Sequence, residues 1–70
     1  MATVPAHITG VVLKIDCAVG DVVAEGDTVV VLESMKMEMP VEAGEAGTVI
    51  EVCCSEGEAV HEGDTLVVLG

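Results

Sequence analysis

VAEGDTVVVL, at residues 23–32, recurs 37 positions later as VHEGDTLVVL, at residues 60–69. The similarity extends over residues 10–33 and 47–70, where 12 of the 24 aligned residues are identical. Chance would give roughly one or two identities, and an internal repeat of this kind decides the architecture. Two copies are too few for a solenoid, so we expect two interlocking halves related by a pseudo-twofold axis within one domain, residues 1–70. Residues 34–46, the one stretch without a copy, would form a hairpin between the halves.

The composition predicts an all-β protein. The chain contains 15 Val but no Phe, Tyr or Trp. Branched side chains favour strands because they fit a pleated surface and lose little rotamer freedom there. Short apolar runs end at Gly or Asp, and no segment has a helical period. We expect strands near residues 7–9 and at residues 11–17, 28–33, 37–41, 48–54 and 65–69, with short strands around inward-facing Val23 and Val60.

These strands imply two small antiparallel sheets of about four strands each, which close as a flattened barrel or sandwich, a barrel-sandwich hybrid. In the strand at residues 11–17, Leu13, Ile15 and Cys17 alternate with Lys14, which places Lys14 on a solvated outer face. The run of three Val at residues 29–31 breaks such an alternation. Either both faces of that strand are covered, or the strand contains a bulge.

The charge of the chain excludes several classes of function. Its formal net charge is −11, and it contains no Arg. Nucleic-acid binding needs cations that displace counterions, and an anionic membrane would repel this chain. No apolar run approaches the ~20 residues of a membrane span. The acidity either keeps the domain in solution or complements a basic partner protein.

The cysteines and histidines do not form a recognisable site. Cys17, Cys53 and Cys54 are odd in number, two are adjacent, and no metal-ligand spacing is present. Cys17 and Cys54 are repeat mates, which predicts equivalent buried positions. His7 and His61 have no paired ligand or nucleophile nearby in the sequence. His61 replaces Ala24 of the first copy in a turn, so we expect it at the surface. Free thiols and the lack of a secretory signal suggest a reducing cytoplasm.

The segment ESMKME, at residues 33–38, contains Lys36, one of only two basic residues. Two strands joined by residues 34–37 would make a hairpin with Lys36 near its tip. Strand periodicity places Met35 and Met37 on one side and Lys36 on the other, in solvent. An exposed lysine amine between Glu33 and Glu38 is protonated at neutral pH and is a poor nucleophile without help. Lys36 therefore suits a target that another enzyme deprotonates and modifies.

ESMKME resembles the biotin attachment motif of biotin carboxyl carrier domains, in which a lysine lies between two methionines. The pattern Gly20-Asp21-x-Val23-x-x-Gly26-Asp27-x-Val29, and Gly47-Thr48-Val49 after the hairpin, also resemble that family. The resemblance covers almost the whole chain. It implies a flattened antiparallel barrel of two four-stranded sheets that displays the target lysine on the turn between the halves.

The resemblance also implies a function. Lys36 would be acylated by a biotin protein ligase, and Met35 and Met37 would be recognition residues that favour carboxylation of the attached biotin. The domain would be a non-catalytic carrier. It would shuttle carboxybiotin from a biotin carboxylase to a carboxyltransferase, most often one that acts on an acyl-CoA. Neither nucleic acid, membrane nor metal is expected as a partner, and the acceptor substrate does not follow from these residues.

The chain departs from the family pattern in two places. Ser34 stands where many members have Ala. The short loop at residues 18–26 leaves no room for the protruding thumb of some bacterial acetyl-CoA carboxylase carriers. The chain also lacks the long linker of many carrier domains, so we expect a free-standing attachment protein or an excised domain.

Several alternatives remain at Lys36. Lipoylation would make the chain a lipoyl carrier, although lipoyl domains usually show Asp-Lys-Ala at this turn. Met35, Met37 and Met39, at every second position, resemble a set of soft thioether ligands for Cu(I). The remaining readings are an ordinary solvated hairpin lysine and a purely structural interaction domain.

Overall fold

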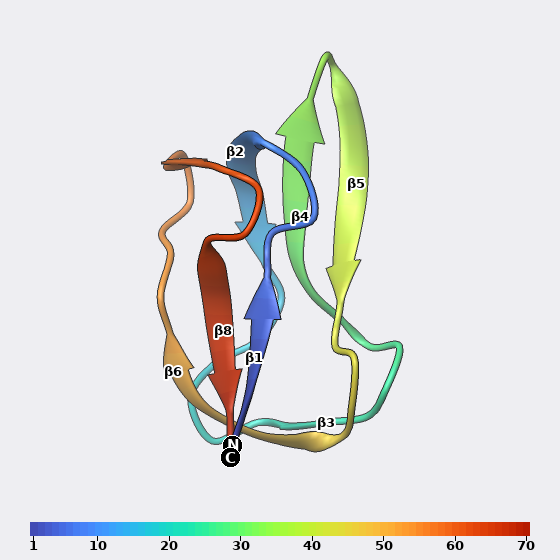
Figure 1. The fold of residues 1–70 in the computed structure, drawn as a ribbon, viewed down its shortest axis with the longest axis vertical. Coiled ribbons are helices and arrows are strands. Elements are labelled where there is room, and N and C mark those ends of the chain that lie inside the picture. Colours follow the sequence, from blue (N-terminus) through green and yellow to red (C-terminus); the bar gives the residue numbers. More distant parts are fainter.

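The computed structural model describes all of residues 1–70 and consists of strands joined by turns (Figure 1). The strands are β1 (Ala2–Pro5), β2 (Gly10–Ile15), β3 (Val22–Val23), β4 (Thr28–Ser34), β5 (Met37–Glu42), β6 (Gly47–Val52), β7 (Ala59–Val60) and β8 (Thr65–Leu69). No helix is present that would be long and apolar enough to cross a membrane.

The strands form two four-stranded antiparallel sheets, ordered β1-β8-β6-β3 and β5-β4-β2-β7. This confirms the predicted all-β fold of two four-stranded sheets. A shift of 37 residues maps β5 onto β1, β4 onto β8, β2 onto β6 and β7 onto β3, so one sheet order becomes the other. The duplication in the sequence is therefore a pseudo-twofold symmetry of the structure.

The structural repeat reaches further than the sequence identities. β5 is the counterpart of β1, and Val41 and Ala43 are buried like their mates Val4 and Ala6. The hairpin region from residue 39 onwards therefore has a copy in residues 2–9, contrary to the expectation for residues 34–46. Identity over these eight positions is too low to reveal the relation, because only the two inward-facing pairs match.

The two halves interlock because each short strand pairs with the other half. β3 pairs with β6, and β7 pairs with β2. The supporting hydrogen bonds are also symmetric, since the Val12 amide donates to the Glu58 carbonyl at 2.8 Å and the Val49 amide donates to the Asp21 carbonyl at 2.8 Å. Neither half can complete its sheets alone, so the fold depends on both copies.

Turns with the sequence Glu-Gly-Asp precede β4 and β8. Gly26 and Gly63 have φ of 90° and 93°, a region that glycine enters without a steric penalty. The carboxylate of Asp27 accepts a hydrogen bond from the Ala24 amide at 2.8 Å, and Asp64 accepts from the His61 amide in the same way. These acidic residues stabilise the turns, which explains why they recur with the repeat.

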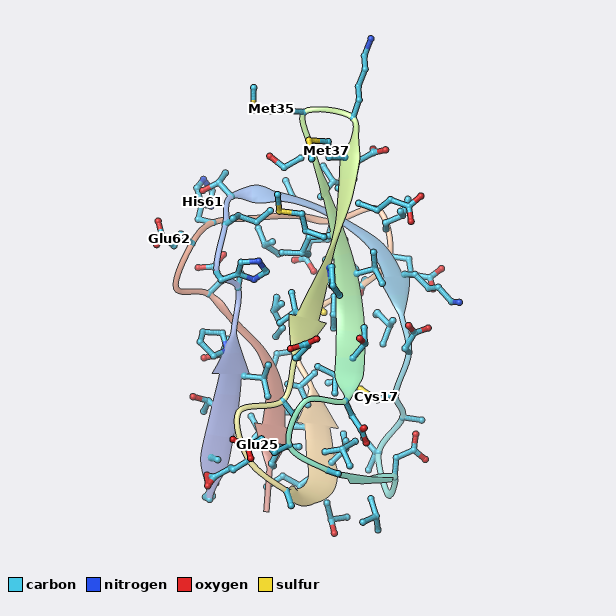
Figure 2. The ribbon with its side chains drawn as sticks, turned by 90° about the vertical axis from the view of Figure 1, so that its right-hand side faces the viewer. Cys17, Glu25, Met35, Met37, His61 and Glu62 are labelled. Atoms are coloured by element: carbon cyan, nitrogen blue, oxygen red, sulfur yellow. The ribbon has the colours of Figure 1, made fainter.

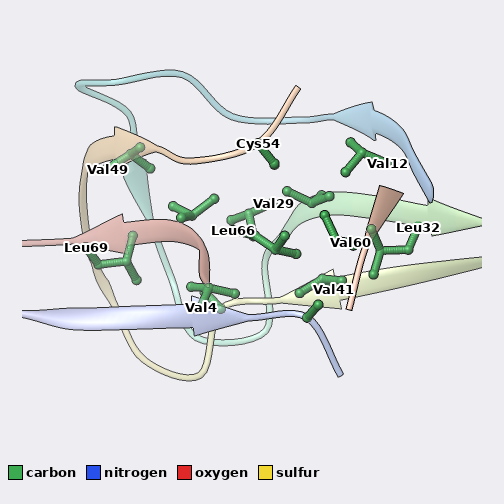
Figure 3. Packing of buried hydrophobic residues seen from close by; sticks show 14 of the residues in the cluster. Val4, Val12, Val29, Leu32, Val41, Val49, Cys54, Val60, Leu66 and Leu69 are labelled. Carbon is green, nitrogen blue, oxygen red and sulfur yellow. The ribbon is translucent and has the colours of Figure 1, made fainter. Parts of the chain in front are cut away.

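The core lies between the two sheets and consists of 15 buried residues, all apolar (Figure 3). Val23 and Val60 face inward, as predicted. Val29 and Val30 are both fully buried because the register of β4 against β5 shifts between Thr28 and Val30. The run of three Val thus contains a bulge, which turns two consecutive side chains toward the core.

Three expectations about strands were wrong. The first strand is Ala2–Pro5, and residues 7–9 form a loop, because the repeat places β1 opposite the end of β8. β2 ends at Ile15 and its mate β6 ends at Val52, so neither strand reaches Cys17 or Cys54 as expected. Leu13 is 41% exposed whereas Val12 is buried, because the register shifts between Val12 and Lys14 and interrupts the alternation.

Candidate functional site

Lys36 lies at the tip of the β4–β5 hairpin. Ser34 and Met37 form the last pair of the ladder, so the loop consists of Met35 and Lys36 alone. Both loop residues have positive φ, 54° and 64°. A two-residue loop with this backbone matches the right-handed twist of the flanking strands and makes the tightest hairpin connection. The predicted hairpin and the position of Lys36 at its tip are confirmed.

The tip is exposed and carries two large apolar side chains (Figure 2). Met35 is 92% exposed and Met37 is 59% exposed. We had expected strand alternation to place Met35 and Met37 on the same side of the hairpin. Met35 belongs to the turn and not to a strand, so that argument does not apply to it. Full burial of a Met side chain is worth about 1.5–3 kcal/mol, which these residues forgo in the isolated domain. The tip therefore offers an apolar contact to another molecule.

The amine of Lys36 is free. The other lysine, Lys14, forms an ion pair with Asp16 at 3.3 Å, whereas Lys36 is exposed and takes part in no ion pair or hydrogen bond. Nothing has to be broken before an enzyme can engage this side chain.

The base of the hairpin is acidic. Glu33 and Glu38 are exposed and directly opposite each other in the β4–β5 ladder. Like charges in opposed positions destabilise a sheet by a few tenths of a kcal/mol. Both carboxylates were expected near Lys36, but their cross-strand pairing was not predicted.

The hairpin is far from the one hollow in the surface. That hollow is at the opposite end of the molecule, beside both chain termini, and is lined by Met1, Ala2, Glu45, Ala46, Leu69 and Gly70. A group attached to Lys36 would have no pocket in this domain to bind in. The arrangement suits an arm that is presented to other proteins.

The other candidate residues do not converge on Lys36. No three His, Cys, Asp or Glu side chains are arranged to hold a metal ion. Cys54 is buried, as predicted, whereas its mate Cys17 is only half-buried. Burial, followed by nearby Asp21 and Asp16, raises the pKa of the Cys17 thiol, and burial with Glu58 raises the pKa of Cys54. Both shifts disfavour the thiolate, which is the nucleophilic and metal-binding form of cysteine.

The histidines and the third methionine have ordinary positions. His61 is in a surface turn, with its Nδ1 atom 3.9 Å from the Asp64 carboxylate, and His7 is also exposed. Met39 is half-buried on β5 opposite Leu32, unlike the exposed Met35 and Met37. The three thioethers thus have different environments.

The role of Gly10 at the base of the hairpin was not predicted from the sequence. Gly10 begins β2 beside the end of β4, and a Cβ atom built there would be 2.6 Å from the carbonyl oxygen of Glu33. The match between Gly10 and Gly47 in the repeat suggested that a glycine is needed here. The sequence does not show which part of the backbone approaches each glycine.

Comparison with known proteins agrees with this geometry. A family model described as "Biotin-requiring enzyme" matches residues 1–69. The chain is 51% identical over 43 residues to "Biotinylated protein TB7.3 homolog" from Mycobacterium leprae, and the aligned residues cover 61% of each chain. It is 46% identical over 44 residues to a "Biotin carboxyl carrier protein" from Streptococcus mutans, covering 63% of this chain and 34% of the relative.

The fold also matches a solved structure, the urea carboxylase of Kluyveromyces lactis. The TM-score is 0.93 at 36% identity, over 99% of this chain and 6% of that one. The chain thus spans less than two thirds of each of these proteins. Since the family match covers nearly every residue, the chain belongs to the biotin/lipoyl attachment family.

Proposed function

We propose that Lys36 is the attachment point for biotin and that this domain is a biotin carboxyl carrier. The observation that carries the proposal is the free amine of Lys36 at the tip of a two-residue hairpin, between the exposed Met35 and Met37. The names of the biotinylated and carrier relatives support biotin over lipoate as the attached group.

The residues present fit the attachment chemistry. A biotin protein ligase would have to deprotonate the Lys36 amine, which then attacks the activated carboxyl carbon of biotin. An amide bond forms, the activating group leaves, and the amine proton passes to the ligase or to solvent. Lys36 has no partner to release first, and the side chains of Met35 and Met37 beside it are exposed.

When bound, biotin supplies a ring nitrogen that accepts a carboxyl group from a biotin carboxylase and gives it up to a carboxyltransferase. The domain itself would hold the attached biotin where its partner enzymes can reach it. Its principal dimensions are 31 × 19 × 18 Å, and the hairpin extends beyond the rest of the molecule at one end of the long axis (Figure 1). A rigid mount with a flexible arm raises the local concentration of the carried group at both partners.

This role makes the chain a carrier and not a catalyst. Glu33 and Glu38, the neighbouring carboxylates, make no hydrogen bond to Lys36. The bond chemistry would be done by a biotin protein ligase, a biotin carboxylase and a carboxyltransferase, with an acyl-CoA as the expected acceptor. The likeness to a domain of a urea carboxylase supports a carboxylase as the parent system.

Modification by a ligase tests the proposal. The protein is incubated with a biotin protein ligase, ATP and biotin, and its intact mass is measured. We expect one biotinyl group on the wild type and on Lys14→Arg, and none on Lys36→Arg. An unmodified wild type, or equal labelling of Lys36→Arg, would contradict the proposal. A parallel incubation with a lipoate ligase and lipoate shows whether the domain accepts that group instead.

A further inference from the structure

The close approach of two backbones at the base of the hairpin points to a positioning residue. A Cβ atom at Gly10 would be 2.6 Å from the carbonyl oxygen of Glu33, 3.3 Å from its carbonyl carbon and 3.5 Å from the Cβ atom of Ser34. Contacts below 3.0 Å between a Cβ atom and a backbone do not occur in relaxed structures. Only glycine at this position lets β2 come so close to the end of β4.

This contact lies where the pairing between β2 and β4 ends. Val11 and Glu33 form the final pair between β2 and β4, and β4 continues to Ser34 beyond it. β5 is an edge strand whose neighbour is β4 alone. Beyond Gly10 the hairpin is therefore a short two-stranded ribbon, with one more pair, Ser34 with Met37, before the turn. Met35 is 92% exposed and Met37 is 59% exposed. The direction of the ribbon depends on how β2 and β4 meet at its base.

The repeat provides an internal comparison. Gly47 is the mate of Gly10 and begins β6, at the end of the molecule that holds the chain termini. A Cβ atom at Gly47 would be 3.2 Å from the carbonyl oxygen of Gly70 and from the Cβ atom of Leu69. That contact is looser than the one at Gly10. The tighter of the two equivalent approaches is thus the one beneath Lys36.

We propose that Gly10 is a positioning residue that sets the direction in which the hairpin presents Lys36 to the enzymes acting on it. A side chain at Gly10 would push Glu33 and Ser34 away from β2 and tilt the ribbon. The displacement grows toward the tip, because the ribbon is held only at its base. The proposal rests on the proposed function of Lys36 as the biotinylated residue.

The test compares Gly10→Ala with Gly47→Ala in biotinylation by a biotin protein ligase. A displacement of about 1 Å in a reacting group can cost a hundredfold in rate, so a shift of a few tenths of an ångström at the base predicts a loss of about tenfold in kcat. We expect that loss in Gly10→Ala and a kcat within about twofold of the wild type in Gly47→Ala. Partial unfolding is distinguishable, because fewer folded substrate molecules raise the apparent KM and leave kcat unchanged.

A second measurement does not depend on any enzyme. Residual dipolar couplings of the N–H bonds at residues 35–37 report the orientation of the tip relative to the body of the domain. They should change in Gly10→Ala and stay as in the wild type in Gly47→Ala. Unchanged couplings in Gly10→Ala, a wild-type kcat in that variant, or equal losses of kcat in the two variants would overturn the proposal. If the wild type is not biotinylated, the proposed function fails, while the couplings still decide whether Gly10 orients the hairpin.

Discussion

Met35 and Lys36 form a turn whose backbone conformation is unusual for their residue types. Turns with positive φ at both central positions strongly prefer Asn-Gly or Asp-Gly, because a Cβ atom approaches the following carbonyl oxygen. Met35 and Lys36 adopt φ of 54° and 64° although neither is one of the residues that favour this region. Met and Lys at these positions therefore lower the stability of the turn. Backbone strain of this kind is common at functional sites.

This strain predicts that Met35→Asn stabilises the domain. Asn tolerates the left-handed region better than Met, and little buried contact is lost because Met35 is 92% exposed. The free energy of unfolding from urea denaturation should rise by about 0.5–1 kcal/mol. Met37→Asn is the control, since Met37 is at a strand position where Asn gives no such relief. A loss of stability in Met35→Asn would show that the turn is not strained at this residue.

Met35→Ala should affect the two reactions of Lys36 differently. The apolar side chain is exposed, which fits a contact made with a carboxylase more than one needed for folding. We expect carboxylation of the biotinylated domain to slow by about tenfold, because one apolar contact worth about 1.5 kcal/mol is lost. Biotinylation should slow less. The rates of the two steps, measured on the same variant, check this. Equal slowing of both would count against recognition of Met35 by the carboxylase.

At the scale of the strands, bulges decide which side chains enter the core. Leu32 on β4 is completely buried, whereas Leu13 on β2 is 41% exposed beside a register shift. Leu32→Ala should therefore lower the free energy of unfolding by about 2–5 kcal/mol, and Leu13→Ala by about 1 kcal/mol or less. Thermal and urea unfolding of both variants provide the measurement. Similar losses in the two variants would mean that Leu13 faces the core and that β2 has no bulge there.

The strands also show what the sequence can and cannot predict. β8 was predicted to the residue and β4 within one, because each follows a Glu-Gly-Asp turn and contains a dense apolar run. β1 was misplaced because Ala2–Pro5 owes its pairing to β8, which is distant in the sequence. The Lys36 hairpin was predictable from its place between two copies, whereas the contact of Gly10 with Glu33 was not, because it joins residues 23 positions apart through strand packing.

The whole molecule presents its lysine hairpin and its termini at equivalent positions of a pseudo-twofold fold. Ala2 pairs with Leu69 at one end, as Met39 pairs with Leu32 at the other. The two termini therefore lie side by side, in the place where the symmetric half has a turn (Figure 1). We therefore expect the fold to depend on the pairing of the strands and not on the position of the chain ends.

This symmetry predicts that a circular permutant folds. Residue 70 is joined to residue 1 by a short Gly-rich linker, and the chain is opened between Gly44 and Glu45, which are exposed and make no backbone hydrogen bond. The permutant should keep the strand signature in circular dichroism, a cooperative thermal transition and biotinylation at Lys36. A second permutant, opened between Met35 and Lys36, should fold but lose biotinylation. An unfolded first permutant would contradict the independence of the fold from its chain ends.

The central claim is that the amine at the tip of this fold carries biotin. The most direct measurement is the mass of the peptide containing Lys36 from protein purified from its natural source. We predict a single biotinyl group on Lys36 and none on Lys14. An unmodified Lys36 in cells with active biotin-dependent carboxylases, or a lipoyl group in its place, would contradict the claim.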